Sequence, residues 1–416
     1  MERASERELD GVVDTGLLAG TLILRNGGET YRAEETMISV ATSLGAESAS
    51  AFVTPTVVML SCRDGSGGSR TRIQRVASRT INLGKIARVN EVSRRLAVGR
   101  FRLAGPVSSL LSRIDRASPH RPAWVTLATA VASACFSLLF NGSPSDAVVA
   151  FAVGAVMRLA LFALSPLGLS PFISAMSGGA VVSLLTGLAV ASGAIASSGN
   201  VSISVLMSLV PGVAIVNAIR DIIAGDLVAG SARVLEAFVI AAGLSIGAAF
   251  GLFAFATQGS YSTAILARTE RLSAFVLAFG ATASFAYFFH INRYDIFWAS
   301  LFGGAGWLVY LWAGKDLANP VAGFFAGALF VGLCAELAAF LLRKPATVYI
   351  LPGIIPFVPG GGMYETMLLA VQGNLAVASG MALRTLSQAA AIAVGVALAS
   401  SLSRLLARIH PRAARR

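Results

Sequence analysis

The side chains that could do chemistry in this chain stand beside prolines and glycines in otherwise apolar segments. Glu365 lies between Tyr364 and Thr366, shortly after the pair Pro359-Gly360. A carboxyl group can carry a proton or bind an ammonium group, and the two neighbouring hydroxyls can hydrogen-bond a small polar molecule. Because a charge in an apolar segment of membrane length is costly unless it is paired or hydrated, these residues predict a binding site.

Two further ionisable groups fit such a site. Arg384 lies near the middle of an apolar run at 375–403, where it could pair with Glu365, with Glu336 or with a carboxylate of a bound molecule. A purely structural ion pair is the alternative. Glu365 and Glu336 could each carry a coupling proton. The predicted substrate-binding residues are Pro211, Gly212, Asn217, Pro352, Gly353, Gly360, Tyr364, Glu365, Thr366 and Arg384.

An offset of 148 residues relates the elements that must position these side chains. Val210-Pro211-Gly212 corresponds to Val358-Pro359-Gly360, and Gly225-Asp226-Leu227 corresponds to Gly373-Asn374-Leu375. Each copy holds an odd number of apolar segments, so the second must enter the membrane from the opposite side, as inverted repeats of secondary transporters do. The predicted divisions are an N-terminal domain at 1–120, a first repeat at 121–260, a second repeat at 269–408 and a basic tail at 409–416.

The composition is that of a membrane protein. Hydrophobic residues make up 55% of the chain and charged residues only 13%, whereas soluble domains carry about 25% charged residues. A spanning helix needs roughly 20 mainly apolar residues. We therefore predict a polytopic α-helical membrane protein with about ten transmembrane helices in two inverted five-helix repeats, preceded by a small N-terminal cytoplasmic α+β domain. The apolar runs are 122–140, 145–163, 171–192, 200–219, 234–256, 272–289, 295–312, 319–341, 347–371 and 375–403.

The Pro-Gly pairs mark the runs that should be irregular. Proline removes a backbone donor and glycine adds freedom, so Pro211-Gly212 should break the fourth run, and the segment from Pro352 to Gly360 should break the ninth. Irregular backbone at membrane depth survives only inside protein or along a wet cavity. We expect the two breaks to meet near the midplane, where helix N-termini could hold a carboxylate. A kink that only shapes packing is the alternative.

Lysine and arginine set the expected orientation, because those near the apolar runs concentrate on one side of the membrane. By the positive-inside rule that side is the cytoplasm, so both termini should be cytoplasmic and the loop from Gln258 to Arg271 external, in the inner membrane of the cell. The net charge of +12 then reflects topology and attraction to lipid headgroups rather than nucleic-acid binding. The inside set is Arg113, Arg116, Arg121, Arg220, Arg233, Arg293, Arg343, Lys344, Arg404, Arg408, Arg412, Arg415 and Arg416, and the outside set is Arg268, Arg271 and Lys315.

The first 120 residues contain no apolar run of membrane length. Arg32, Glu34 and Glu35 lie on one predicted amphipathic helix, and Arg32 and Glu35, three apart, could pair with each other or with cytoplasmic loops and so gate access. A solvated ion pair without function is the alternative. Helices are predicted at 7–26, 29–44 and 82–101, and β strands at 52–60 and 70–76 around a turn at 64–68.

No cofactor or metal site is predicted. The three cysteines and three histidines are scattered along the chain, at Cys62, Cys135, Cys334, His120, His290 and His410. Neither metal-ligand spacing nor a disulfide framework results. Because no nucleotide-binding loop is present, the energy for transport would come from an ion or substrate gradient, and the carboxyl groups of Glu336 and Glu365 favour a proton.

Two unlike regions resemble a known family. The stretch from Gly28 to Met37, with Phe52–Thr56 and the basic residues 70–90, looks like the N-terminal half of the threonine/serine exporter family, and Leu351–Gly362 looks like its C-terminal half. The resemblance implies a ten-span secondary exporter of small polar metabolites. Its substrates would be threonine and serine, as in single-chain members, or dicarboxylates such as succinate, as in two-subunit members.

We therefore predict a proton-coupled threonine/serine exporter, which could form a homo-oligomer. A zwitterion needs an anionic and a cationic or dipolar anchor, whereas a dianion needs two cationic anchors, and only Arg384 is clearly mid-membrane. A dicarboxylate exporter is the main competing function. A channel is less favoured, and so is a membrane-anchored hydrolase that uses Arg32, Glu34 and Glu35.

Overall fold

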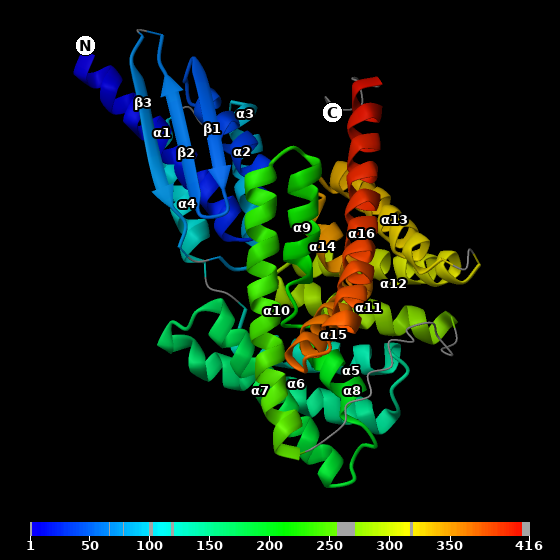
Figure 1. The fold of residues 1–416 in the computed structure, drawn as a ribbon. Coiled ribbons are helices and arrows are strands. Elements are labelled where there is room, and N and C mark those ends of the chain that lie inside the picture. The colour runs from blue at the N-terminus through cyan, green and yellow to red at the C-terminus, as the bar shows by residue number, and fades with distance from the viewer. Residues whose placement is uncertain are drawn as a thin grey trace.

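The computed structural model describes residues 2–65, 67–77, 79–99, 103–117, 120–255, 271–316 and 319–409 (Figure 1). Most of the predicted external loop, from Gln258 onward, lies outside the described residues. His410 and the rest of the basic tail also lie outside them.

The N-terminal residues form four helices and one small sheet, which we call the N-terminal unit. Gly45 follows the end of the second helix with φ +105°, a conformation that side chains rarely adopt. The fourth helix was not predicted from the sequence. The elements are α1 (Glu2–Arg25), α2 (Thr30–Ser43), β1 (Ser48–Thr54), β2 (Val57–Arg63), β3 (Ser69–Arg75), α3 (Leu83–Ala97) and α4 (Ala104–Arg116).

The sheet is antiparallel with strand order β1-β2-β3. The hairpin predicted around residues 64–68 is confirmed, because Arg63 pairs with Ser69. The single strand predicted at 52–60 is wrong, because the chain turns at Pro55-Thr56 and Thr54 pairs with Val57. Proline lacks the backbone donor that a continuous strand needs, so the turn forms there.

Eight helices in the described part of the chain are long and apolar enough to cross a membrane. The count rises to nine if the bent pair Thr347–Phe357 and Gly360–Val371, which meet at 54°, is one span. This supports a polytopic membrane protein, with a count below the predicted ten. The eight are α5 (Pro122–Leu139), α6 (Pro144–Leu164), α7 (Pro171–Ala191), α10 (Leu227–Phe255), α11 (Arg271–Phe288), α12 (Arg293–Asp316), α13 (Pro320–Leu342) and α16 (Leu375–Ile409).

The difference from ten lies in the fourth predicted run, which is two short helices, α8 (Ser198–Leu206) and α9 (Gly212–Ile223). The corresponding stretch of the ninth run is α14 (Thr347–Ile354), a 3-10 turn and α15 (Gly360–Val371). Pro211 and Pro359 precede α9 and α15 with nearly the same backbone angles, φ −77° and ψ 42° against φ −76° and ψ 51°. Pro352 does not break the chain, since α14 continues through it.

The short helices α9 and α15 lie at the centre, and each packs against both α10 and α16 (Figure 1). Outside them, α7 packs on α10 and α13 on α16, while α5 contacts α11. The apolar core of the N-terminal unit is continuous with that of the apolar helices, and it contains both Leu22 and Val358. The backbone N–H of Leu83 also donates to the Phe289 carbonyl at 2.9 Å. The two parts therefore share one packed interior.

Candidate functional site

The two helix breaks touch each other reciprocally. A Cβ added to Gly212 would overlap Val358 Cγ1, and a Cβ added to Gly360 would lie 3.1 Å from Val210 Cγ1. Each glycine thus faces the valine that stands two residues before the other glycine. At Gly212 only glycine allows so close an approach, and at Gly360 a side chain would require the neighbouring side chains to shift.

A cavity of about 260 Å³ lies beside this crossing, and we call it the proximal cavity because the N-terminal unit forms one wall. Four predicted binding residues line it, namely Pro211, Gly212, Asn217 and Gly360. Asn217 is only 2% exposed, and its Oδ1 has no hydrogen-bond partner in the described part of the chain. Because buried polar atoms are normally satisfied, this oxygen is available to a bound molecule.

A second cavity of about 940 Å³, the distal cavity, lies against the other side of the α14–α15 break. Arg384 lines it, together with Pro359 and Asn200. Met207 and Val358 line both cavities. These two apolar side chains therefore stand between the cavities, at the crossing of the breaks.

The remaining predicted binding residues are absent from the described linings of both cavities. Tyr364 is buried and its carbonyl accepts from the Ser245 hydroxyl. Thr366 donates to the Gly362 carbonyl at 2.7 Å. Pro352 and Gly353 are buried within α14, where a Cβ on Gly353 would press on Val331.

The two carboxylates predicted to couple protons lie on different helices. Glu365 is half-buried in α15, and its buried Oε2 has no hydrogen-bond partner in the part of the chain that the structure describes. Glu336 in α13 accepts a hydrogen bond from the Ser400 hydroxyl at 2.7 Å.

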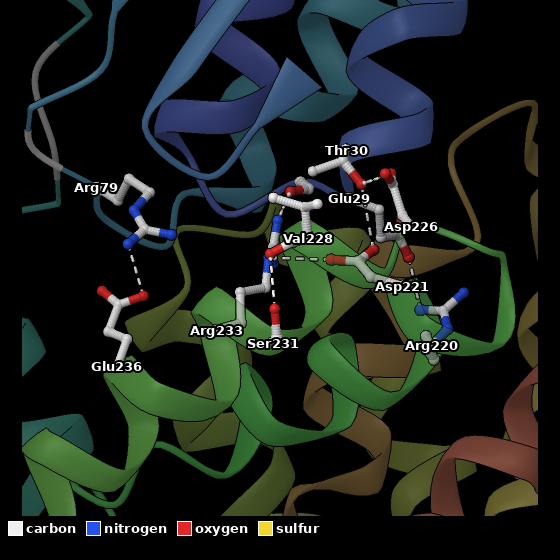
Figure 2. A network of polar contacts seen from close by, with 11 residues as sticks. Glu29, Thr30, Arg79, Arg220, Asp221, Asp226, Val228, Ser231, Arg233 and Glu236 are labelled. Carbon is white, nitrogen blue, oxygen red and sulfur yellow. Dashed lines mark hydrogen bonds and ion pairs between the residues drawn. The ribbon is translucent and has the colours of Figure 1, made fainter. Parts of the chain in front are cut away.

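A buried ionic cluster joins the N-terminal unit to α9 and α10 (Figure 2). Glu29 is 1% exposed and contacts Arg220 at 2.5 Å and Arg32 at 2.6 Å. Asp221 pairs with Arg233 at 3.1 Å. Burial alone would raise the pKa of Glu29, but the guanidinium groups of Arg220, Arg32 and Arg233 outweigh it and lower that pKa. The carboxylate is therefore ionised and compensated.

Hydrogen bonds and one further ion pair add to the contacts between the N-terminal unit and the helices α9 and α10, which we call the junction (Figure 2). The Thr30 hydroxyl donates to Asp226 at 2.7 Å, and Arg233 Nη2 donates to the Gly28 carbonyl at 3.0 Å. Arg79 and Glu236 pair at 2.6 Å, and both side chains line the proximal cavity. The junction thus reaches the cavity wall.

The three residues predicted to gate access have different surroundings. Arg32 pairs with Glu29 rather than with Glu35, which is exposed. Burial works to lower the pKa of Arg32, but the Glu29, Tyr31 and Glu336 charges raise it. Glu34 accepts from the Val53 N–H at 2.9 Å, and burial raises the pKa of its carboxyl group.

Glu29 and Arg79 were missed by sequence reasoning. Glu29 immediately precedes α2 and partners a residue 191 positions away, and nothing in the local pattern identifies that partner.

The spacing of the histidines in the sequence also did not predict their contact. The structure brings His120 and His290 together, with ring centroids 4.7 Å apart. Among the described residues no group of three potential metal ligands occurs.

Two curated proteins that resemble this chain are named as transporters. A curated relative from Klebsiella aerogenes, named as a probable succinate transporter subunit, is 24% identical over 261 residues, which is 62% of this chain and 99% of the relative. A relative from Mycobacterium tuberculosis, named as a probable threonine/serine exporter, is 22% identical over 370 residues, which is 86% of this chain and 69% of the relative. No solved structure matches the chain.

Family models cover both halves. One model of threonine/serine exporters matches residues 14–254, and a second model of threonine/serine exporters matches residues 274–402. The first match alone exceeds half of the chain, and the second covers the apolar helices that follow it. The chain belongs to the threonine/serine exporter family.

Proposed function

We propose that the protein is a secondary exporter of threonine and serine that exposes one central site to the proximal and distal cavities in turn. The observation that carries this proposal is the reciprocal crossing of the two helix breaks. Gly212 meets Val358 and Gly360 meets Val210, with a cavity on either side. A small shift of one break against the other would open one cavity and close the other.

The regular spacing of helix starts in the two halves supports this mechanism. α5 and α11 begin 149 residues apart, and α9 and α15 begin 148 residues apart. Each half contributes one broken element to the crossing. With the positive-inside rule, the N-terminal unit and both termini lie in the cytoplasm of an inner membrane, so the proximal cavity faces the cytoplasm.

The proximal cavity suits a small zwitterion. The first residues of α9 and α15, Gly212 and Gly360, line it, and helix N-termini favour a carboxylate. Asn217 Oδ1, which has no partner among the residues that the structure describes, offers an acceptor for an ammonium or hydroxyl group. The mycobacterial relative named for threonine and serine also matches most of the chain. Succinate is the second candidate, favoured by the Klebsiella relative.

Proton coupling would use the two half-buried carboxylates. Glu365 has an oxygen without a hydrogen-bond partner among the described residues, so it can take up a proton without breaking a contact. Glu336 influences Arg32 electrostatically. Protonation of Glu336 would therefore remove a negative charge that stabilises the Arg32 guanidinium group. The N-terminal end of α2, which carries Arg32, Glu34 and Glu35, would then act in gating.

Transport by the purified protein in proteoliposomes tests the proposal. We expect an imposed pH gradient to accelerate uptake of labelled threonine and serine over succinate, and a protonophore to abolish the acceleration. Glu365→Gln should lose the proton-driven component, whereas Glu91→Gln, on the exposed surface of α3, should not. A preference for succinate would replace the amino-acid assignment, and transport of none of the three would contradict export of this substrate class.

A further inference from the structure

The proximal cavity contains a cation and an anion that no predicted site included. Arg79 Nη2 and Glu236 Oε2 lie 2.6 Å apart, and both side chains line the cavity. We propose that Arg79 binds the α-carboxylate and Glu236 the α-ammonium group of the transported amino acid. This proposal rests on the proposed export function and names the recognition element of the same site.

The position of the pair fits such a role. Arg79 comes from the segment between β3 and α3, and Glu236 comes from α10, so the pair bridges the N-terminal unit and an apolar helix (Figure 2). The two side chains are 24% and 32% exposed. Partial burial strengthens charge-assisted hydrogen bonds while leaving the pair accessible from the cavity.

The third charged group on this wall is already occupied. Arg233 is 7% exposed, pairs with Asp221 and donates to the Gly28 carbonyl. It therefore holds the junction together and is not free to exchange partners. Among the charged residues that line the cavity, this leaves Arg79 and Glu236 as the pair that a ligand can separate.

A zwitterion can separate the pair without leaving a charge uncompensated. Its carboxylate replaces Glu236 at Arg79, and its ammonium group replaces Arg79 at Glu236, so two ion pairs replace one. Asn217 lines the same cavity, and its Oδ1, without a partner in the described part of the chain, can accept a hydrogen bond from the side-chain hydroxyl of threonine or serine. A dianion would gain Arg79 but would face the carboxylate of Glu236. The pair thus selects amino acids over dicarboxylates.

Entry of the ligand also changes the cavity wall. Because Arg79 belongs to the N-terminal unit and Glu236 to α10, a ligand between them must separate these two elements locally. The apolar part of the wall, which includes Phe285 and Ile240, has no such contact to exchange. Substrate binding would therefore loosen the cytoplasmic wall at this point.

Calorimetric titration of the purified full-length protein with threonine, serine and succinate tests the recognition. We expect Arg79→Gln and Glu236→Gln each to weaken threonine binding ~10- to 100-fold, the range for loss of one charge-assisted hydrogen bond. Glu236→Gln should also reduce the ratio of threonine affinity to succinate affinity. Arg72→Gln is the control, because Arg72 on β3 forms an equally short ion pair with Asp14 on α1, away from the cavity.

A charge-exchanged variant guards against simple loss of folding. The double variant Arg79→Glu with Glu236→Arg retains an ion pair, so it should fold. Because its charges stand in the reverse order, its affinity for threonine should remain as low as that of the single variants. Threonine affinity equal to that of the unmodified protein, in this double variant or in both single variants, would make the pair structural and overturn the inference. The unmodified protein must bind threonine or serine in the same assay, because its failure to bind either would instead contradict the proposed function.

Accessibility of the cavity provides a second readout. Ser208 lines the proximal cavity, and Ser208→Cys can be studied after Cys62, Cys135 and Cys334 are replaced by serine. Threonine should raise labelling of this cysteine by a soluble thiol reagent, and Arg79→Gln should raise it without threonine. If labelling responds to neither, the pair does not close the wall.

Discussion

At the scale of single residues, His290 lies in the turn between α11 and α12 and contacts the segment that precedes α5. It has φ +58° in that turn. Its Nδ1 accepts a hydrogen bond from the His120 backbone N–H at 3.2 Å. Only a neutral imidazole can accept at this nitrogen, so the contact requires His290 to be uncharged.

This requirement makes stability depend on pH. Burial, with the charges of His120, Arg158 and Lys85, lowers the pKa of His290 to about 4, against about 6.5 in an unfolded chain. Between these values the unfolded chain binds more protons than the folded protein, so stability is full above pH ~6.5 and falls as the pH drops toward 4. Thermal unfolding in detergent at several pH values would show it.

The variant that isolates this effect is His290→Asn. Asparagine tolerates the left-handed backbone and its Oδ1 can accept the same N–H, but it does not titrate. We expect the difference in melting temperature between pH 7 and pH 5 to be larger for the unmodified protein than for the variant. Equal differences would show that His290 is already solvated.

Single residues also show how far sequence reasoning reached. The spacing of the Pro-Gly pairs predicted that Pro211, Gly212 and Gly360 line one cavity, because proline and glycine mark in the sequence where a helix is interrupted. Asn217 followed from the same element. The sequence did not show which face of α15 meets the cavity. Glu365 was therefore predicted to line it, but neither described cavity lining includes this residue. That orientation depends on packing against α10 and α16.

At the scale of elements, the crossing of the α8–α9 and α14–α15 breaks depends on the absence of side chains at two glycines. Gly212→Ala would place a methyl group against Val358. Overpacking of this kind typically destabilises by about 1–3 kcal/mol. We expect a lower melting temperature and slower transport in Gly212→Ala, with partial recovery when Val358→Ala is added.

Gly380 in α16 is the control for that substitution. A Cβ there would meet nothing within 4 Å, so Gly380→Ala should leave stability unchanged or raise it, because alanine favours helix. If Gly212→Ala behaved like Gly380→Ala, the breaks would not form a tight crossing.

Elements far from the breaks were less predictable. The hairpin at residues 64–68 was evident from its glycines, whereas the Pro55-Thr56 turn was hidden within a run of β-forming residues. The α4 helix buries Val107 and Leu111 against α1 and α3. Its short amphipathic pattern acquires a partner only in the folded chain, and so the sequence alone offered little reason to place a helix there.

At the scale of the whole molecule, the N-terminal unit packs directly against the apolar helices rather than being joined to them only by a linker. The apolar core runs continuously between them, and the Glu29 cluster provides a buried ion pair to α9 and a buried hydrogen bond to α10. α9 is also the helix that begins at the first break, with Gly212 at one end and Arg220 near the other. A displacement of the N-terminal unit would therefore be transmitted to the crossing.

Glu29→Gln tests this coupling across the molecule. The substitution leaves Arg220 and Arg32 without their carboxylate, and removal of one partner from a buried ion pair costs about 3–5 kcal/mol. We expect a large fall in melting temperature with slower threonine transport, whereas Arg72→Gln, which breaks an exposed pair, should cost less than about 1 kcal/mol. Because the destabilisation comes from the orphaned charge, adding Arg220→Met to Glu29→Met should recover much of the stability relative to Glu29→Met alone. Recovered stability with transport still impaired would show that the ionic contact itself couples the N-terminal unit to α9, whereas an unchanged melting temperature in Glu29→Gln would mean that the cluster does not hold the two parts together.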